Sequence, residues 1–324
     1  MSRLLRTLAA LVGAVLLAAP ALAAAPSVDV QPEQLPRGAD IAIAHIEDGV
    51  FVDGDRRVDL GAPRAYLLGR SGKAWIVGTT NADGGGRFRI KRLRPDDSFK
   101  TLLRGVSPYE VVVSDDGGRL ARTTLHTRDK SSVVRVWSAR SGRLLADRTF
   151  AGYLDVRALA GDQVVLAGDR GTLEWDSTTD WTGRITRRRA WEVDLSLDLM
   201  ASFTGDPYED GCTVVSPVTR PRKMLWRSCK ERVEAFSPDG ERMATVHILS
   251  DGIGPVDVWL REVDGTRRAH YTTSWFGSIR WESDTALLLD VNGERKASTV
   301  RCVVEVCENA TDPGKVPTYR LSAR

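Results

Sequence analysis

Short runs of alternating apolar and polar residues follow one another along most of this chain, separated by turns rich in Gly, Asp and Ser. One run ends at Phe236, a tight turn follows through Asp239 and Gly240, and alternation resumes at Met243. A degraded copy of this pattern lies at residues 112–121. Alternation with a period of two predicts β-strands joined by hairpins. No long segment has the 3.6-residue period of a helix, so we expect essentially no helix in the folded domain.

The apolar residue that follows each tight turn recurs at a nearly constant interval of 44 or 45 residues. The series consists of Trp75, Leu120, Val165, Met243 and Leu287. The wider gap before Met243 has room for one shorter unit, which residues 197–203 fill. Units of this length that consist of short strands are typical of the blades of a β-propeller.

A second marker, a Trp at the end of an alternating strand, repeats at compatible intervals at Trp137, Trp175 and Trp259. We interpret these side chains as packing residues between blades. Together the two markers predict six blades from about residue 62 onward.

Three more short strands precede these blades, at residues 41–45, 49–52 and 56–60. They form an almost complete further blade, which we expect a strand from the other terminus to close, because an open ring leaves unpaired strand edges. The fold predicted is therefore all-β, a single β-propeller with seven blades, six being the fallback.

The N-terminal residues have the pattern of a secretory signal. Arg3 and Arg6 precede an apolar run at 8–19, and small residues around Ala21 and Ala23 supply a cleavage site. The run is too short to span a membrane. We therefore expect a signal peptide at 1–23, a linker at 24–38, a propeller domain at 39–324, and a secreted, extracytoplasmic protein without a membrane span.

The charge of the chain gives no reason to expect a polyanionic partner. The formal net charge of +3 falls to +1 when the two arginines of the signal are removed. A nearly neutral protein has no global field that attracts nucleic acid. We expect a monomer with no nucleic-acid partner.

Four cysteines in an exported chain predict two disulfides. A hairpin that turns at Arg220-Pro221 places Cys212 opposite Cys229, and facing residues of an antiparallel pair have the separation that a disulfide needs. By elimination Cys302 pairs with Cys307, although Val304-Glu305 is poor turn chemistry.

Three sequence elements carry a family resemblance. The element Phe236-Ser237-Pro238-Asp239-Gly240 is similar to the turn of TolB-type repeats, Trp175-Asp176 to the dipeptide of WD40 blades, and Leu225-Trp226-Arg227 to the outer strands of quinoprotein-type propellers. The chain thus resembles an exported WD40-like or TolB-type β-propeller of actinobacterial type. No Gly-His dipeptide is present, so the buried network of true WD40 blades is not expected. The resemblance implies a binding platform.

No catalytic or metal-binding pattern stands out. The four histidines are isolated from one another, and no Gly-x-Ser-x-Gly is present. We therefore expect a non-enzymatic protein without a cofactor or metal, which binds a protein or cell-envelope polymer through its loop faces. Trp181 and Trp275 fit no repeat and are the candidate contact residues.

Two less favoured functions stay open. Propeller active sites draw residues from distant blades, so a carbohydrate-active hydrolase or lyase with paired carboxylates in the central funnel is the alternative. A quinoprotein-like oxidoreductase is a third and weaker hypothesis.

Two segments of the chain concentrate charge. The densest acidic loop is Asp206 to Asp210, interpreted as a solvated turn. The densest basic stretch is 184–191, interpreted as an outer strand whose charges protect a sheet edge.

Overall fold

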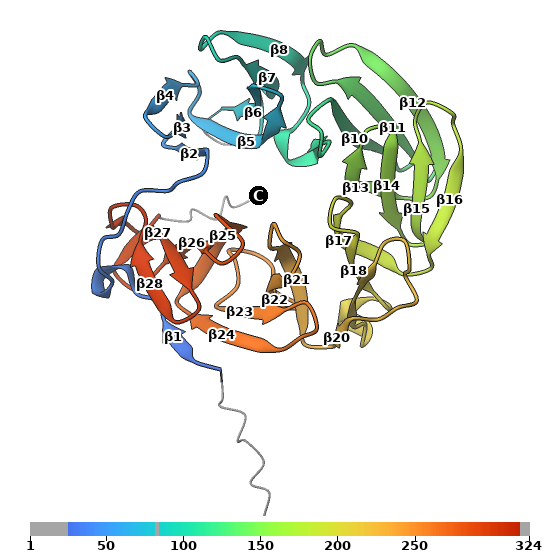
Figure 1. The fold of residues 1–324 in the computed structure, drawn as a ribbon. Coiled ribbons are helices and arrows are strands. Elements are labelled where there is room, and N and C mark those ends of the chain that lie inside the picture. The colour runs from blue at the N-terminus through green and yellow to red at the C-terminus, as the bar shows by residue number, and fades with distance from the viewer. Residues whose placement is uncertain (1–24, 82–83, 318–324) are drawn as a thin grey trace, which may run out of the picture.

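Seven small antiparallel sheets follow one another around a ring in the computed structural model, which describes residues 25–81 and 84–317 (Figure 1). The predicted signal peptide therefore lies outside the described residues. Within each blade the first of its consecutive strands lies nearest the centre of the ring and later ones lie progressively outward, and β1 (Ser27–Asp29) is added at the outer edge of one sheet. The prediction of a seven-bladed β-propeller is confirmed.

The blades are numbered here in chain order. Blade one is β2 (His45–Glu47), β3 (Val50–Asp53) and β4 (Arg56–Asp59). Blade two is β5 (Arg64–Ser71), β6 (Ala74–Thr80), β7 (Arg89–Leu93) and β8 (Phe99–Arg104). Blade three is β9 (Val112–Val113), β10 (Arg119–His126), β11 (Ser131–Ser138) and β12 (Leu144–Ala151). Blade four is β13 (Leu154–Ala160), β14 (Gln163–Gly168), β15 (Gly171–Asp176) and β16 (Thr182–Thr186).

Blades five, six and seven also have four consecutive strands each. Blade five is β17 (Arg189–Asp194), β18 (Leu199–Phe203), β19 (Thr213–Pro217) and β20 (Trp226–Ser228). Blade six is β21 (Glu231–Phe236), β22 (Arg242–His247), β23 (Asp257–Glu262) and β24 (Arg267–Thr272). Blade seven is β25 (Trp275–Trp281), β26 (Leu287–Asn292), β27 (Lys296–Val303) and β28 (Val306–Asn309).

Helical structure among the described residues is limited to three short 3-10 turns. They are η1 (Pro32–Gln34), η2 (Pro108–Glu110) and η3 (Pro207–Glu209). In the part of the chain that the structure describes, no helix has the length and apolarity needed to cross a membrane.

The repeated turn of the sequence has the same internal hydrogen bonds in both copies. The Ser237 hydroxyl donates to the Asp239 carboxylate at 2.5 Å and accepts the amide of Arg242 at 2.8 Å. In the degraded copy, Ser114 donates to Asp116 at 2.5 Å. A Ser and an Asp two residues apart therefore fix this hairpin through local side-chain bonds.

Apolar side chains from neighbouring blades interdigitate and form the core. Trp175 is almost fully buried, and its ring meets the ring of Phe150 in the preceding blade, with centroids 5.7 Å apart. Trp137 packs against the cluster around Leu120. Trp259 instead stacks on His270 of its own blade, at 5.2 Å. Because each sheet is apolar on both faces, a blade is stable only between two neighbours.

The N-terminal segment adds an outer strand to blade six. Strand β1 (Ser27–Asp29) runs parallel to β24, with Val28 opposite Tyr271. Further along, the side-chain amide of Asn309 in blade seven donates to the carbonyls of Pro32 and Leu35 at 2.9 Å. The segment assigned above to a linker is extended, and it lies along blades six and seven (Figure 1).

Blade one has three strands, and the expected closing strand from the other terminus is not present among the described residues. The last described strand, β29 (Gly314–Lys315), pairs with β27 of blade seven. Residues 41–44 are also outside the first strand, because Ile41 packs against Leu288 and Ala310 of blade seven. The chain uses these residues to cross from blade seven to blade one.

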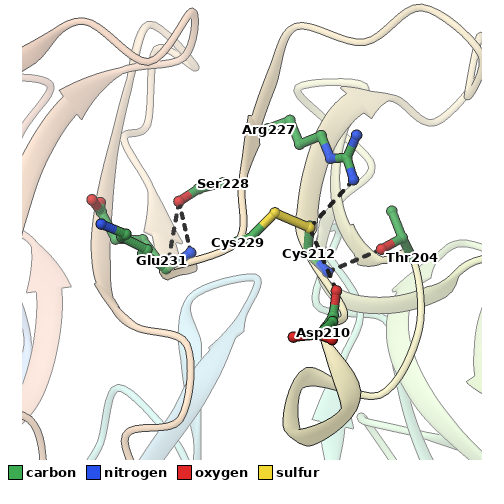
Figure 2. The surroundings of a disulfide bond; sticks show 8 residues. Thr204, Asp210, Cys212, Arg227, Ser228, Cys229 and Glu231 are labelled. Atoms are coloured by element: carbon green, nitrogen blue, oxygen red, sulfur yellow. Dashed lines mark hydrogen bonds between the residues drawn. A yellow bond between two sulfur atoms is a disulfide. The ribbon is translucent and has the colours of Figure 1, made fainter.

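Both predicted disulfides are present. Cys212 is bonded to Cys229, and their Cα atoms are 4.0 Å apart (Figure 2). Thr213 faces Ser228 in the adjoining strands, which is the register predicted from the turn. The Cys212 amide donates to Thr204 Oγ1 at 2.9 Å, so the bridge also fixes the end of β18.

The second bridge joins Cys302 to Cys307 across a short hairpin. Val304 in its turn has a φ of 51°, a left-handed conformation that is uncommon for a β-branched residue. The structure thus contains the unfavourable turn that the sequence indicated, and the disulfide closes it.

Candidate functional site

A large cavity lies where the ring begins and ends, between blade one and blade seven. Its volume is about 1050 Å³. Trp275, Arg280 and Asp290 line it from blade seven, and Ile46 and Asp48 line it from blade one. The cavity lies beside the blade with one strand fewer than its neighbours. We refer to this cavity as the junction cleft.

The junction cleft carries more negative than positive charge. Six carboxylates and three guanidiniums line it: Asp40, Glu47, Asp48, Asp55, Asp290 and Asp312, with Arg37, Arg57 and Arg280. The guanidiniums all contact carboxylates, for example Arg57 Nη2 to Glu47 Oε2 at 3.1 Å. Among the described residues Asp48 and Asp55 form no ion pair. The cleft is therefore acidic and attracts cationic groups.

One donor in the cleft has no protein acceptor. The Nε atom of Arg280 is buried and forms no hydrogen bond among the described residues. Its Nη1 atom lies 3.8 Å from the Asp290 carboxylate, which accepts the Thr299 hydroxyl at 2.7 Å. A buried donor without an acceptor is rare in a folded protein. It marks a place where an acceptor atom of a ligand can bind.

The two tryptophans proposed as contacts lie in different places. Trp275 begins β25 and lines the junction cleft, partly buried. Trp181 lies in the turn between β15 and β16 and is 56% exposed. Its ring lies over Gly183, where an added Cβ atom would meet the indole at 2.3 Å. Of the two, Trp275 is the one that lines the junction cleft.

Irregular backbone in three consecutive innermost strands places a second group of side chains together. β13, β17 and β21 each contain a β-bulge, at Arg157, Trp191 and Glu234. A bulge re-aims the side chain of its extra residue. Here the guanidiniums of Arg157 and Arg232 lie 5.4 and 5.1 Å from the centre of the Trp191 ring, within the range of cation–π attraction.

Two carboxylates in this group are close enough to affect each other. Burial, and secondarily the charge of Glu234, raises the pKa of Glu192 to about 7, although Arg157 opposes the change. Burial also raises the pKa of Glu234, against the effect of Arg232, whose Nε donates to Glu234 at 2.8 Å. No hydrogen bond joins the Glu192 carboxylate to another described residue. A carboxylate whose pKa is raised toward neutral pH is suited to act as a general acid or base.

The sequence interpretation of the basic stretch 184–191 was wrong in part. Its first residues belong to β16, the outermost strand of blade four, as expected. Its last residues begin β17, the innermost strand of blade five, and Trp191 lies among the central side chains. The sequence did contain a signal for the pair of central carboxylates. Glu192 and Glu234 are 42 residues apart, close to the blade interval, and each lies between apolar residues of a strand.

In the acidic loop around η3, the Asp206 carboxylate is used in a hydrogen bond within the loop itself. The Asp206 carboxylate accepts the amide of Tyr208 at 2.9 Å and caps the turn. In residues 25–81 and 84–317, no three His, Cys, Asp or Glu side chains are grouped so that they could hold a metal ion.

Comparison with known proteins shows similarity of fold. No family model and no curated protein matches the chain. Among solved structures, the AfRom2 CNH domain has a TM-score of 0.52 at 9% identity, with 82% of this chain and 97% of that chain covered. An oligogalacturonate lyase in complex with manganese has a TM-score of 0.50 at 13% identity, over 76% and 82%. TolB from Acinetobacter baumannii has a TM-score of 0.48 at 14% identity, over 79% and 66%. The chain is a seven-bladed β-propeller whose structural neighbours include the TolB type that the sequence resembles.

Proposed function

We propose that this protein is a secreted, non-enzymatic binding platform, and that the junction cleft receives a protein or cell-envelope partner. The observation that carries the proposal is the cleft itself: about 1050 Å³ in volume, open between two blades, and lined by Trp275 and an excess of carboxylates. Two disulfides support an extracytoplasmic location, because such bonds persist in oxidising compartments.

The lining of the cleft favours a cationic segment as the bound element. Asp48 and Asp55 supply negative charge and, within residues 25–81 and 84–317, have no ion-pair partners of their own. Arg280 Nε offers a donor for a carbonyl oxygen. An aromatic side chain beside such polar groups is the composition of a contact centre, in which a few anchors supply most of the binding energy. A Lys- or Arg-bearing loop of a partner protein fits these three features.

The test compares variants of the whole protein in quantitative capture from a cell-envelope extract. We expect Trp275→Ala, and separately Asp48→Asn combined with Asp55→Asn, to reduce the captured partner at least tenfold. Trp181→Ala is the matched control, since it removes an exposed indole far from the cleft lining. Equal capture by the wild-type protein and both cleft variants would show that the partner does not use the cleft.

The central carboxylates favour the alternative function, a carbohydrate-active hydrolase or lyase. Glu192 has the pKa of about 7 that suits a general acid or base near neutral pH. Incubation of the protein with neutral and acidic oligosaccharides tests this candidate, with product release measured for wild type and Glu192→Gln. Turnover that is lost in Glu192→Gln and retained in Trp275→Ala would support the enzyme and remove the non-enzymatic part of the proposal.

A further inference from the structure

A second cavity lies between blades two and three and is lined by cationic side chains. Its volume is about 440 Å³. Five of its lining residues are basic, none is acidic, and the five are Lys73, Arg92, Arg94, Lys100 and Arg140. Such a concentration of one sign of charge is unusual in a protein whose formal net charge is only +3. We refer to this cavity as the basic pocket.

Three separate turns on one face of the ring supply three of these cations, and strands β7 and β8 supply Arg92 and Lys100. Lys73 comes from the turn between β5 and β6, and Arg94 comes from the turn between β7 and β8. Arg140 comes from the turn between β11 and β12 in the next blade. In that turn Gly142 has a φ of 76°, and a Cβ atom there would lie 2.5 Å from the carbonyl oxygen of Leu102. The close backbone approach holds the cations of the two blades around one space.

Arg92 is fixed in place by the protein before any ligand binds. Its guanidinium donates to Ser71 Oγ at 2.7 Å, to the Ser71 carbonyl at 3.0 Å and to the Ala139 carbonyl at 3.1 Å. These bonds use three of the five N–H donors of an arginine, so two remain for another acceptor. Because its position is fixed, the guanidinium loses little freedom when a ligand binds.

The positive charges of the basic pocket repel one another, and the nearest carboxylates offset them only in part, Asp96 through its interaction with the charge of Arg94. Burial lowers the pKa of Arg92, and the charges of Arg140 and Arg94 lower it further. The closest turn contains two carboxylates, of which Asp97 pairs with Arg56 at 2.8 Å. The other, Asp96, accepts the hydroxyl of Ser98 at 2.6 Å. An anionic ligand would remove the repulsion among the cations.

We infer that the basic pocket binds a terminal phosphate group, carried by a small molecule or by the end of a polyphosphate chain. A terminal phosphate presents three oxygens in different directions and up to two negative charges, which matches cations that two blades place around one pocket. A carboxylate has two coplanar oxygens and a single charge, so it can satisfy fewer of these donors at once. The site is separate from the junction cleft and does not depend on the function proposed for it.

The test is calorimetric titration of the whole protein with inorganic pyrophosphate at low salt. Polyphosphate, as a polymeric phosphate, and polygalacturonate, as a polymeric carboxylate, are titrated in parallel. We expect saturable binding of pyrophosphate, weakened about fivefold or more by Arg140→Gln and by Lys73→Gln, each of which removes one charged hydrogen-bond donor. Arg143→Gln is the matched control, because Arg143 is an exposed residue of the same turn that does not line the pocket.

The outcomes separate the possibilities. Binding of pyrophosphate that falls in Arg140→Gln and is unchanged in Arg143→Gln supports the site, and the polyphosphate titration then shows whether a polymer is accepted too. Three results would overturn the phosphate site: no binding of pyrophosphate, an equal loss of affinity in Arg140→Gln and Arg143→Gln, or binding of polygalacturonate alone. Neither variant alters the junction cleft, so capture of a partner there should be unchanged.

Discussion

Glu231 and Arg261 form a two-point ion pair inside blade six. The Nε and Nη2 atoms of Arg261 lie 2.7 and 2.6 Å from the two carboxylate oxygens of Glu231, and both side chains are largely buried. Thr245, on the strand between them, also donates to Glu231 at 2.6 Å. The pair fixes the relative positions of β21 and β23, and charge removal on one side leaves a buried charge without its partner.

We therefore predict that Glu231→Gln lowers the free energy of unfolding by about 3 to 5 kcal/mol, the usual cost of breaking a buried pair from one side. Urea denaturation followed by tryptophan fluorescence measures the change. Asp97→Asn is the control, because it breaks the more exposed pair with Arg56 and should cost at most about 1 kcal/mol. Similar losses in the two variants would show that the blade-six pair has no special role.

The two disulfides should differ in their contribution to stability. The Cys212–Cys229 bridge closes a loop with a sequence separation of 17, and the Cys302–Cys307 bridge closes one of 5. Replacement of both cysteines by Ser should lower the unfolding free energy by about 3 kcal/mol for the first bridge and about 2 kcal/mol for the second, if loop entropy dominates. Urea unfolding of the two double variants without reductant tests the order, which a larger loss at the shorter loop would contradict.

Glu192 should make stability depend on pH. Its pKa in the folded protein is raised to about 7, above the value in the unfolded chain. Between the two pKa values the folded state therefore binds more protons than the unfolded state, so stability is highest below the unfolded pKa and falls as pH rises to about 7. The expected loss is at most about 3 kcal/mol.

Glu192→Gln should remove this dependence and keep the protein at its low-pH stability. The midpoint of urea unfolding, measured from pH 4 to pH 8 for wild type and the variant, reports the difference. Glu305→Gln, at an exposed turn position, is the control and should follow the wild-type curve. Parallel curves for wild type and Glu192→Gln would mean that this carboxylate is not held in its neutral form.

Gly142→Ala should be more harmful than the same change at another left-handed glycine. Both Gly142 and Gly105 have positive φ values, which cost a residue with a side chain about 1 to 2 kcal/mol. Only at Gly142 would the new methyl group also meet backbone, at 2.5 Å from Leu102 O, whereas Gly105 faces open space. We expect a larger loss in thermal stability for Gly142→Ala, together with weaker pyrophosphate binding, because the turn carries Arg140. Equal melting temperatures would contradict the close approach of blades two and three.

The blade repeat was predictable because its causes are local. The Ser237–Asp239 hydrogen bond forms within a few residues, so the turn is visible in the sequence wherever that pair recurs. The register of the Cys212–Cys229 hairpin follows from counting outward from one dipeptide. The identity of Trp175 as an inter-blade packing residue likewise followed from its interval.

The sites were not predictable in the same way, because they are assembled between blades. Lys73 and Arg140 are 67 positions apart and line one pocket only because blades two and three pack against each other. Ile41 packs against blade seven, although the alternation predicted it in the first strand of blade one. Neither alternation nor spacing contains information about which neighbouring sheet such an apolar residue will contact.

The most direct test of the account is site-specific photocrosslinking in intact cells that produce the protein. A photoreactive phenylalanine analogue replaces Trp275, which lines the junction cleft, or Trp181, which lies exposed in an outer turn. We expect a defined covalent adduct with a partner from position 275 and none from position 181. Adducts of equal yield from both positions, or from position 181 alone, would contradict the claim that the junction cleft is the binding site.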